Sequence, residues 1–181
     1  KWLDNLIIVF ATCGIAIPSF ISSVLLLYQF GMNMKVLPTV GLNSAAAYIM
    51  PVTALAIYPS AYITRLMRSS LLEVMGQDYI RTARAKGLSE HKVIYYHAFR
   101  NTLIPLVTFI GGSLPGLFAG ALITETLFAI PGIGFTSYNA MVAGDIPFSM
   151  FYMTFLAILT LLGNLISDIL YAVVDPRVRI A

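Results

Sequence analysis

The sequence predicts an all-α integral membrane protein, and three observations support this fold class. Of the 181 residues, 59% are hydrophobic and 10% are charged, whereas a soluble domain has about 45–50% and about 25%. The mean hydropathy is +0.85. Four stretches almost without charge each reach the roughly 20 residues that a helix needs to cross a bilayer. Because lipid cannot hydrogen-bond a peptide group, we expect helices and not strands there.

We expect one transmembrane domain over residues 1–181, with four spans, at residues 6–30, 45–68, 101–125 and 147–174. The third span is rich in glycine and proline. Small residues there allow neighbouring helices to approach closely, or they break helices that line a substrate path. Both interpretations stay open, and the second makes Pro115 and Gly116 candidates for the translocation path. The sequence starts with Lys1 and not with Met, so we expect either the interior or C-terminal part of a longer protein or a boundary introduced by cloning, and both interpretations stay open.

The basic residues fix the expected orientation. Under the four-span arrangement, ten of the eleven lysines and arginines lie on one side of the membrane, and only Lys35 lies on the other. Cytoplasmic loops carry such an excess of positive charge. Both chain ends and the segment 69–100 are therefore predicted to be cytoplasmic.

The segment 69–100 has helix signals that a simple topogenic loop does not need. The apolar residues of the stretch Leu71–Lys86 follow a helical stripe: Leu72, Met75, Tyr79, Ile80 and Ala83. Gly87 can end this helix in the left-handed conformation, and Ser89 is a suitable N-cap for the next one. We expect two short helices joined at Gly87 as a basic docking element. The alternative is an ordinary positive loop that contacts anionic membrane lipid.

This segment, DYIRTARAKGLSEHKVIYYHAFRNTLIP, resembles the cytoplasmic signature loop (EAA loop) of ABC-importer permeases, in the oligopeptide, dipeptide and nickel branch, B-type subunit. Arg81 and Thr82 stand where the general pattern has Glu and Ala, and residues 97–100 replace its Ile-x-Leu-Pro. The stretches GIAIPSF (14–20), RSSLLEVMGQDY (68–79), ETLFAIPGIG (125–134) and DPRVR (175–179) also look like this branch.

The resemblance implies the C-terminal core of a type I permease in a bacterial cytoplasmic (inner) membrane. Members of this branch usually carry two further N-terminal spans, so the resemblance also implies that N-terminal spans of the full protein are missing here. The implied partners are a second permease, two cytoplasmic ABC ATPases, an extracellular or periplasmic substrate-binding protein and membrane lipid, with no nucleic acid. The implied ATPase-coupling residues are Arg81, Thr82, Ala83, Arg84, Ala85, Lys86, Gly87, Leu88 and Ser89. Because the chain has no G-x-x-x-x-G-K-[ST] phosphate loop, we expect no enzyme activity and no cofactor of its own. ATP and Mg would belong to partner subunits. The branch leaves open whether the substrate is an oligopeptide, a dipeptide or nickel.

Glu125, Pro131 and Gly132 follow the third span on the predicted outer side. Glu125 is either a polar lip of the outer gate or a helix-end charge that is exposed or paired with Lys35. Both interpretations stay open. The two histidines and one cysteine are too few and too far apart to predict a metal site.

Asn164 and Asp168 share one face of the fourth span, four residues apart. An acidic residue within a membrane is a candidate for function, but we favour a structural pair with Arg65 or Arg100. If Asp168 and Glu125 were proton or ion relays, the protein would be a secondary transporter or channel driven by an ion gradient. A structural scaffold whose basic segment anchors lipid is a third possibility.

Overall fold

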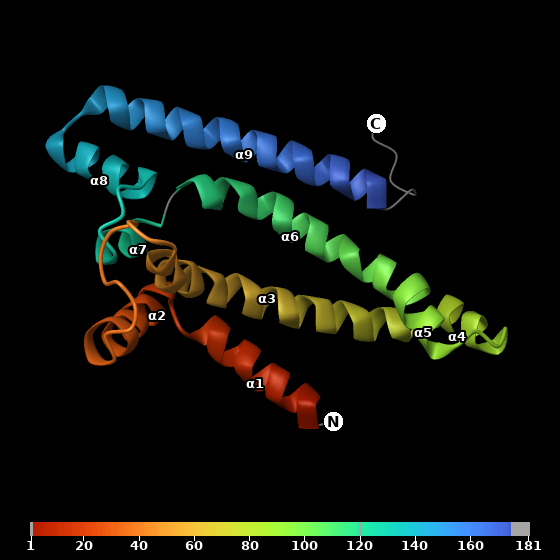
Figure 1. The fold of residues 1–181 in the computed structure, drawn as a ribbon. Coiled ribbons are helices and arrows are strands. Elements are labelled where there is room, and N and C mark those ends of the chain that lie inside the picture. Colours follow the sequence, from red (N-terminus) through yellow and green to blue (C-terminus); the bar gives the residue numbers. More distant parts are fainter. Residues whose placement is uncertain (1, 120, 175–181) are drawn as a thin grey trace. The chain divides into compact units, whose positions relative to one another are not determined.

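A computed structural model describes residues 2–119 and 121–174, and within this part the chain is helical without a strand. The DPRVR stretch at 175–179 lies outside the described residues. The helices are α1 (Trp2–Ala16), α2 (Ser19–Leu26), π-helical η1 (Leu27–Asn33), 3-10 helix η2 (Ala45–Tyr48), α3 (Ile49–Met75), α4 (Asp78–Ala85), α5 (Glu90–Lys92), π-helical η3 (Val93–Ala98), α6 (Phe99–Ala119), α7 (Leu122–Leu127), α8 (Ile133–Ala143) and α9 (Ile146–Val174) (Figure 1).

The chain divides into two compact units, which we describe separately. One holds residues 1–62 and 115–159, and the other holds residues 63–114 and 160–181. Within the described residues, Ala45–Met75 and Ile146–Leu170 are long and apolar enough to cross a membrane, and α1 with the α2–η1 helix makes a third if the bent pair is one span. An all-helical chain with membrane-spanning candidates is therefore confirmed for these residues. The count of four spans stays a prediction.

The predicted span 6–30 is not one straight helix. Helix α1 ends at Ala16, and Trp2–Ala16 is bent by 99° from Ser19–Asn33. Pro18 explains the break, because it has no N–H to continue the helical ladder and it forces the residue before it out of the helical region. The Pro18 carbonyl instead accepts the first hydrogen bonds of α2, from the N–H groups of Ile21 and Ser22.

The predicted span 101–125 is also interrupted. Helix α6 ends at Ala119, and Ala121 lies outside the helical region with φ −112° and ψ 66°. The N–H of Ala121 donates to the Glu125 side chain at 3.0 Å. A backbone donor that would extend α6 is thus used to start α7.

Close helix crossings occur at small residues in each unit. In the first unit, a Cβ on Gly14 would lie 2.8 Å from the Cβ of Ala61, so α1 and α3 are in near-backbone contact. In the second unit, a Cβ on Gly111 of α6 would lie 2.8 Å from the Oγ of Ser167 on α9. Small residues permit this packing. Among the described glycines of the third span, Gly111 makes such a close approach, whereas a Cβ on Gly112 or Gly116 would meet nothing within 4 Å.

Candidate functional site

The candidate site is the hairpin of residues 78–98, built from α4, α5 and η3, which we call the α4–α5 hairpin. The prediction of one helix over Leu71–Lys86 is wrong. Helix α3 runs on to Met75, and the chain then breaks at Gly76 and Gln77 before α4 begins. Glycine is a poor helix former, and Gln77 is extended at ψ 150° as the N-cap of α4.

Gly87 ends α4 in the left-handed conformation, as predicted, with φ +75°. The N–H of Gly87 donates to the carbonyl of Arg84 at 2.9 Å, and the N–H of Leu88 donates to the carbonyl of Ala83 at 3.4 Å. These two bonds are the pair that defines a Schellman motif. A Cβ on Gly87 would meet nothing within 4 Å, so the glycine serves backbone conformation and leaves the turn open to solvent.

A small apolar core supports the turn from inside. Ile80 and Val93 are fully buried there with Ala83 and Ala98, and Leu88 packs against this cluster. Leu71, Val74 and Met75 of α3 also pack on it, which explains why α3 extends past the predicted end at residue 68. The predicted coupling set therefore divides. Ala83 and Leu88 face the core, and the exposed members are Arg81, Thr82, Arg84, Ala85, Lys86, Gly87 and Ser89.

Ser89 takes the N-cap position of the second helix, with ψ 145°, but its side chain makes no capping hydrogen bond. The helix that starts at Glu90 runs past Arg100 without a break. It continues through η3 into α6, so the second arm of the hairpin is the first part of the next long helix.

The sequence did not predict the side-chain hydrogen bond that connects the first helix of the hairpin to the start of α6. The side chain of Asn101 donates to the Tyr79 hydroxyl at 2.9 Å and to the His97 carbonyl at 3.0 Å. The sequence pattern puts Tyr79 on the apolar stripe, yet Tyr79 is 42% exposed. The available signal was the position of Asn101, a polar residue one helical turn after His97 in an aromatic stretch.

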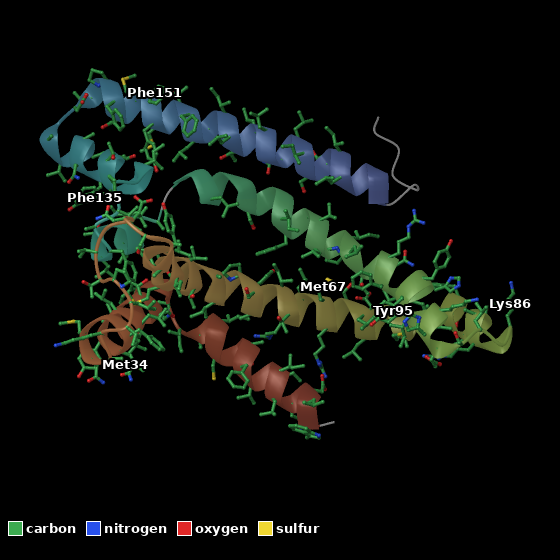
Figure 2. The ribbon with its side chains drawn as sticks, viewed as in Figure 1. Met34, Met67, Lys86, Tyr95, Phe135 and Phe151 are labelled. Carbon is green, nitrogen blue, oxygen red and sulfur yellow. The ribbon has the colours of Figure 1, made fainter. Side chains whose placement is uncertain are left out.

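The charges of the hairpin differ in their surroundings. Arg84 and Glu90 form an ion pair across the turn, with Nε–Oε1 at 2.7 Å and Nη2–Oε2 at 3.3 Å. Lys86 lies at the tip of the hairpin, beside the turn (Figure 2). In the described part of the chain it has no ion pair. Lys86 lines a shallow pocket of about 350 Å³ with Tyr79, Thr82, Ala83, Leu88 and His97.

Glu125 of α7 is a structural clamp in the other unit. Its Oε1 accepts the N–H of Ala121 at 3.0 Å, and its Oε2 accepts the N–H of Phe135 at 2.7 Å. These N–H groups lie at the starts of α7 and α8, where helices leave donors unsatisfied and favour negative charge. In the described residues this half-buried carboxylate has no ion pair with Lys35. The alternative of a Glu125–Lys35 pair is therefore not the arrangement found.

The Glu125 carboxylate occupies the space that a side chain at Gly132 would take, so a larger residue there would displace the carboxylate. A Cβ on Gly132 would lie 2.5 Å from each carboxylate oxygen, and one on Gly134 would lie 3.1 Å from Oε2. Pro131 lies directly before Gly132 in the connection between α7 and α8. By contrast, a Cβ on Gly116 would meet nothing within 4 Å, and the side chain of Pro115 lies outside the described ones. A gate or path role for these residues remains a prediction.

Asn164 and Asp168 are both exposed on α9. Asp168 forms no ion pair with Arg65 or Arg100 in the described part of the chain, so the predicted structural pair is not found. The buried neighbour is Ser167, which faces Gly111. Successive helical residues are about 100° apart, so a helix that packs through Ser167 turns Asp168 away.

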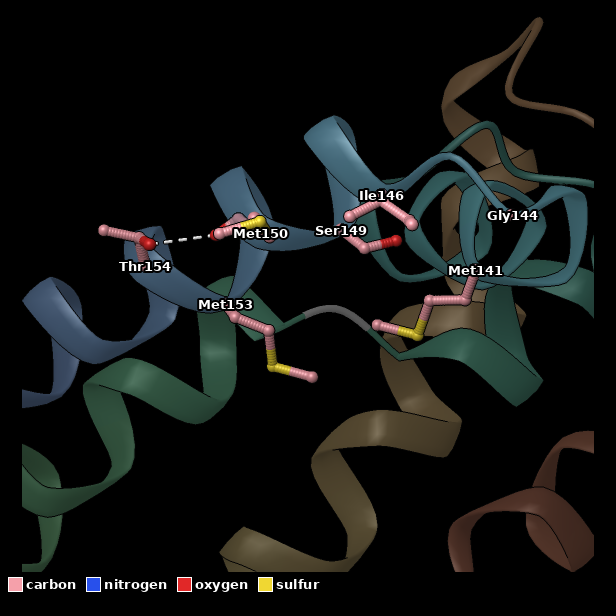
Figure 3. A pocket seen from close by; sticks show the side chains of 7 residues that line it. All are labelled: Met141, Gly144, Ile146, Ser149, Met150, Met153 and Thr154. Atoms are coloured by element: carbon pink, nitrogen blue, oxygen red, sulfur yellow. Dashed lines mark hydrogen bonds between the residues drawn. The ribbon is translucent and has the colours of Figure 1, made fainter.

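A second pocket, which is open to the surface and which the sequence did not predict, lies between α8 and the first turns of α9. It has a volume of about 400 Å³, and the side chains of Met141 and Met153 extend toward its space (Figure 3). Gly144, Ile146, Ser149, Met150 and Thr154 complete its lining. Within the described residues no group of three potential metal ligands of the His, Cys, Asp and Glu types comes together.

Residues 1–180 match the family described as "Binding-protein-dependent transport system inner membrane component". The dipeptide transport system permease protein DppB of Lactococcus lactis subsp. cremoris is 41% identical, over 98% of this chain and 59% of the relative. DppB of Bacillus subtilis is 39% identical, over 99% and 58%. The oligopeptide transport system permease protein OppB of Haemophilus influenzae is 36% identical, over 99% and 59%. The chain thus spans about three-fifths of the length of these relatives.

Proposed function

Because the chain belongs to the family of binding-protein-dependent transport system inner membrane components, we propose that it is the permease part of an ATP-driven importer of peptides. The similar proteins carry dipeptide and oligopeptide permease names, which favours peptides over nickel. The proposed setting is a bacterial inner membrane. The proposed partners are a second permease, two ATPases that bind ATP and Mg, and a binding protein outside.

The observation that carries this proposal is the α4–α5 hairpin. It is a small element with its own core and an open, charged turn, as a docking surface requires. A transport pathway alone does not need such an element. We propose that the turn around Gly87 binds the ATPase and transmits its movement to the membrane helices, because the second arm continues without a break into α6.

The geometry does not favour an ion-gradient mechanism that uses Glu125 as a relay. Both of its oxygens accept backbone N–H groups, so the carboxylate has a structural task in the described chain. Asp168 would be an alternative relay, but it is exposed on α9 and forms no ion pair with Arg65 or Arg100 in the described part of the chain.

Purification of the full-length protein from its native membrane tests the proposal. We expect ATPase subunits in stoichiometric amount and ATP-dependent uptake of a peptide after reconstitution with the binding protein. Uptake driven by an ion gradient in a preparation that lacks ATPase would contradict it.

Cysteine labelling tests the orientation that the proposal needs. The exposed native Cys13 is first replaced by alanine, and single cysteines are then placed at positions 35 and 86. A membrane-impermeant reagent should label position 35 from outside and position 86 only after the membrane is opened. External labelling at 86 would put the hairpin on the wrong side for an ATPase.

A further inference from the structure

The two cations that flank the Gly87 turn are engaged differently. Both Arg84 and Lys86 were expected to give the turn its positive docking surface. In the structure the guanidinium of Arg84 is held by two contacts to the Glu90 carboxylate, at 2.7 and 3.3 Å. Lys86 has no ion pair in the described residues and lies beside the pocket of about 350 Å³.

Their positions relative to the turn explain this division. Arg84 is in the last turn of α4 and Glu90 is in the first turn of α5, so each charge also suits the helix end that carries it. The pair spans the two helices on opposite sides of Gly87. A two-point contact between arginine and a carboxylate fixes orientation as well as distance, so it holds the angle between the arms.

Lys86 has the surroundings of a recognition charge. It is the C-cap of α4, and the pocket beside it offers the His97 ring as a further polar group. The Thr82 hydroxyl also lines the pocket, but it already donates to the Asp78 carbonyl at 3.0 Å. Buried Ala83 and half-buried Leu88 form the apolar floor. A cation over a pocket with an apolar floor and polar rim suits a carboxylate side chain on a short apolar stem.

We propose that Arg84 and Glu90 are positioning residues that hold the Gly87 turn in its docking shape, whereas Lys86 binds an acidic side chain of the ATPase at the adjacent pocket. This inference rests on the proposed function and deepens it. The hairpin then has its docking conformation before the ATPase binds, and of the two cations at the turn only Lys86 contacts the ATPase.

A charge-swap experiment on the complete permease complex separates the two roles. The measurement is the affinity of purified ATPase for the reconstituted complex at low and at high salt. Arg84→Gln and Glu90→Gln should each weaken binding about two- to fivefold, the range for one exposed ion pair, with an unchanged salt dependence. Arg84→Glu alone should weaken binding further because two carboxylates then face each other. Arg84→Glu combined with Glu90→Arg should regain most of that loss.

Lys86→Gln should weaken binding and also flatten the salt dependence, because the charge lost is one that meets the partner. Lys92→Gln is the matched control, an exposed lysine on the same hairpin, and should do neither. If the double swap stays as weak as Arg84→Glu while Glu90→Gln binds normally, Arg84 contacts the ATPase and the positioning role is wrong. If Lys86→Gln and Lys92→Gln are equal, the recognition role of Lys86 is wrong. If Gly87→Val and all these variants bind like the wild type, the proposed function itself fails.

Discussion

The α4–α5 hairpin and the pair α7–α8 join two helices in opposite ways. At the first, the glycine of the turn has open space around it, and the closing groups are exposed side chains. At the second, Glu125 fills the space beside Gly132 and binds the backbone of both helices. An open turn can present its surface to a partner. A connection whose space is filled by its own side chain only fixes the path of the backbone. The comparison therefore assigns docking to the α4–α5 hairpin and a structural role to the α7–α8 pair.

Gly132→Ala should give the largest loss of stability, because it forces a methyl group against the Glu125 carboxylate. Overpacking of this kind costs about 1–3 kcal/mol, and loss of the clamp adds to it. Thermal unfolding of the purified protein in detergent measures the effect. Gly112→Ala is the control, since a Cβ there meets nothing within 4 Å, and it should be neutral or mildly stabilising. Equal stability of the two variants would break the comparison.

Glu125→Ala should come next, because it leaves the N–H groups of Ala121 and Phe135 without their acceptor. A hydrogen bond to a charged group contributes about 1.5–3 kcal/mol. Glu125→Gln keeps one carbonyl oxygen and should lose less. The same unfolding assay ranks the two variants. An ion relay predicts instead that both unfold like the wild type and lose transport equally.

Ser89→Ala should have the smallest effect. Removal of a serine N-cap typically costs about 1 kcal/mol, but here the side chain makes no capping bond. We expect a change of less than about 0.5 kcal/mol, as for other surface substitutions, with normal ATPase binding. A full capping loss would mean that Ser89, and not the Arg84–Glu90 pair, secures the start of α5.

The sequence predicted features that depend on local chemistry. Gly87 takes the left-handed conformation that its position at a predicted helix end indicated. Ser89 takes the N-cap position of the next helix, also as predicted. The basic segment forms a hairpin as expected. The composition was sufficient for the helical membrane class, and the signature segment was sufficient for the family.

Features that depend on distant contacts were not predictable. The Glu125 carboxylate was interpreted as a gate or a surface charge, because its partners are backbone N–H groups that no side-chain pattern reveals. Asp168 was assigned to an arginine, whereas helix packing through Ser167 turns it elsewhere. The break at Pro18 is a local feature, but a membrane span tolerates proline, so the sequence did not distinguish a kinked span from a broken one.

Gly87→Val and Gly144→Val test the docking role of the α4–α5 hairpin most directly. Gly144 ends α8 with φ +74°, and a Cβ on Gly144, like one on Gly87, would meet nothing within 4 Å. Each valine should therefore impose the same backbone cost, on the order of 1–2 kcal/mol, and both variants should insert. Retention of ATPase on the purified complex is measured side by side with ATP hydrolysis per peptide imported. We predict that Gly87→Val loses ATPase or uncouples hydrolysis from import while Gly144→Val retains both. If the two variants retain ATPase equally and import with the same coupling, the hairpin does not dock the ATPase.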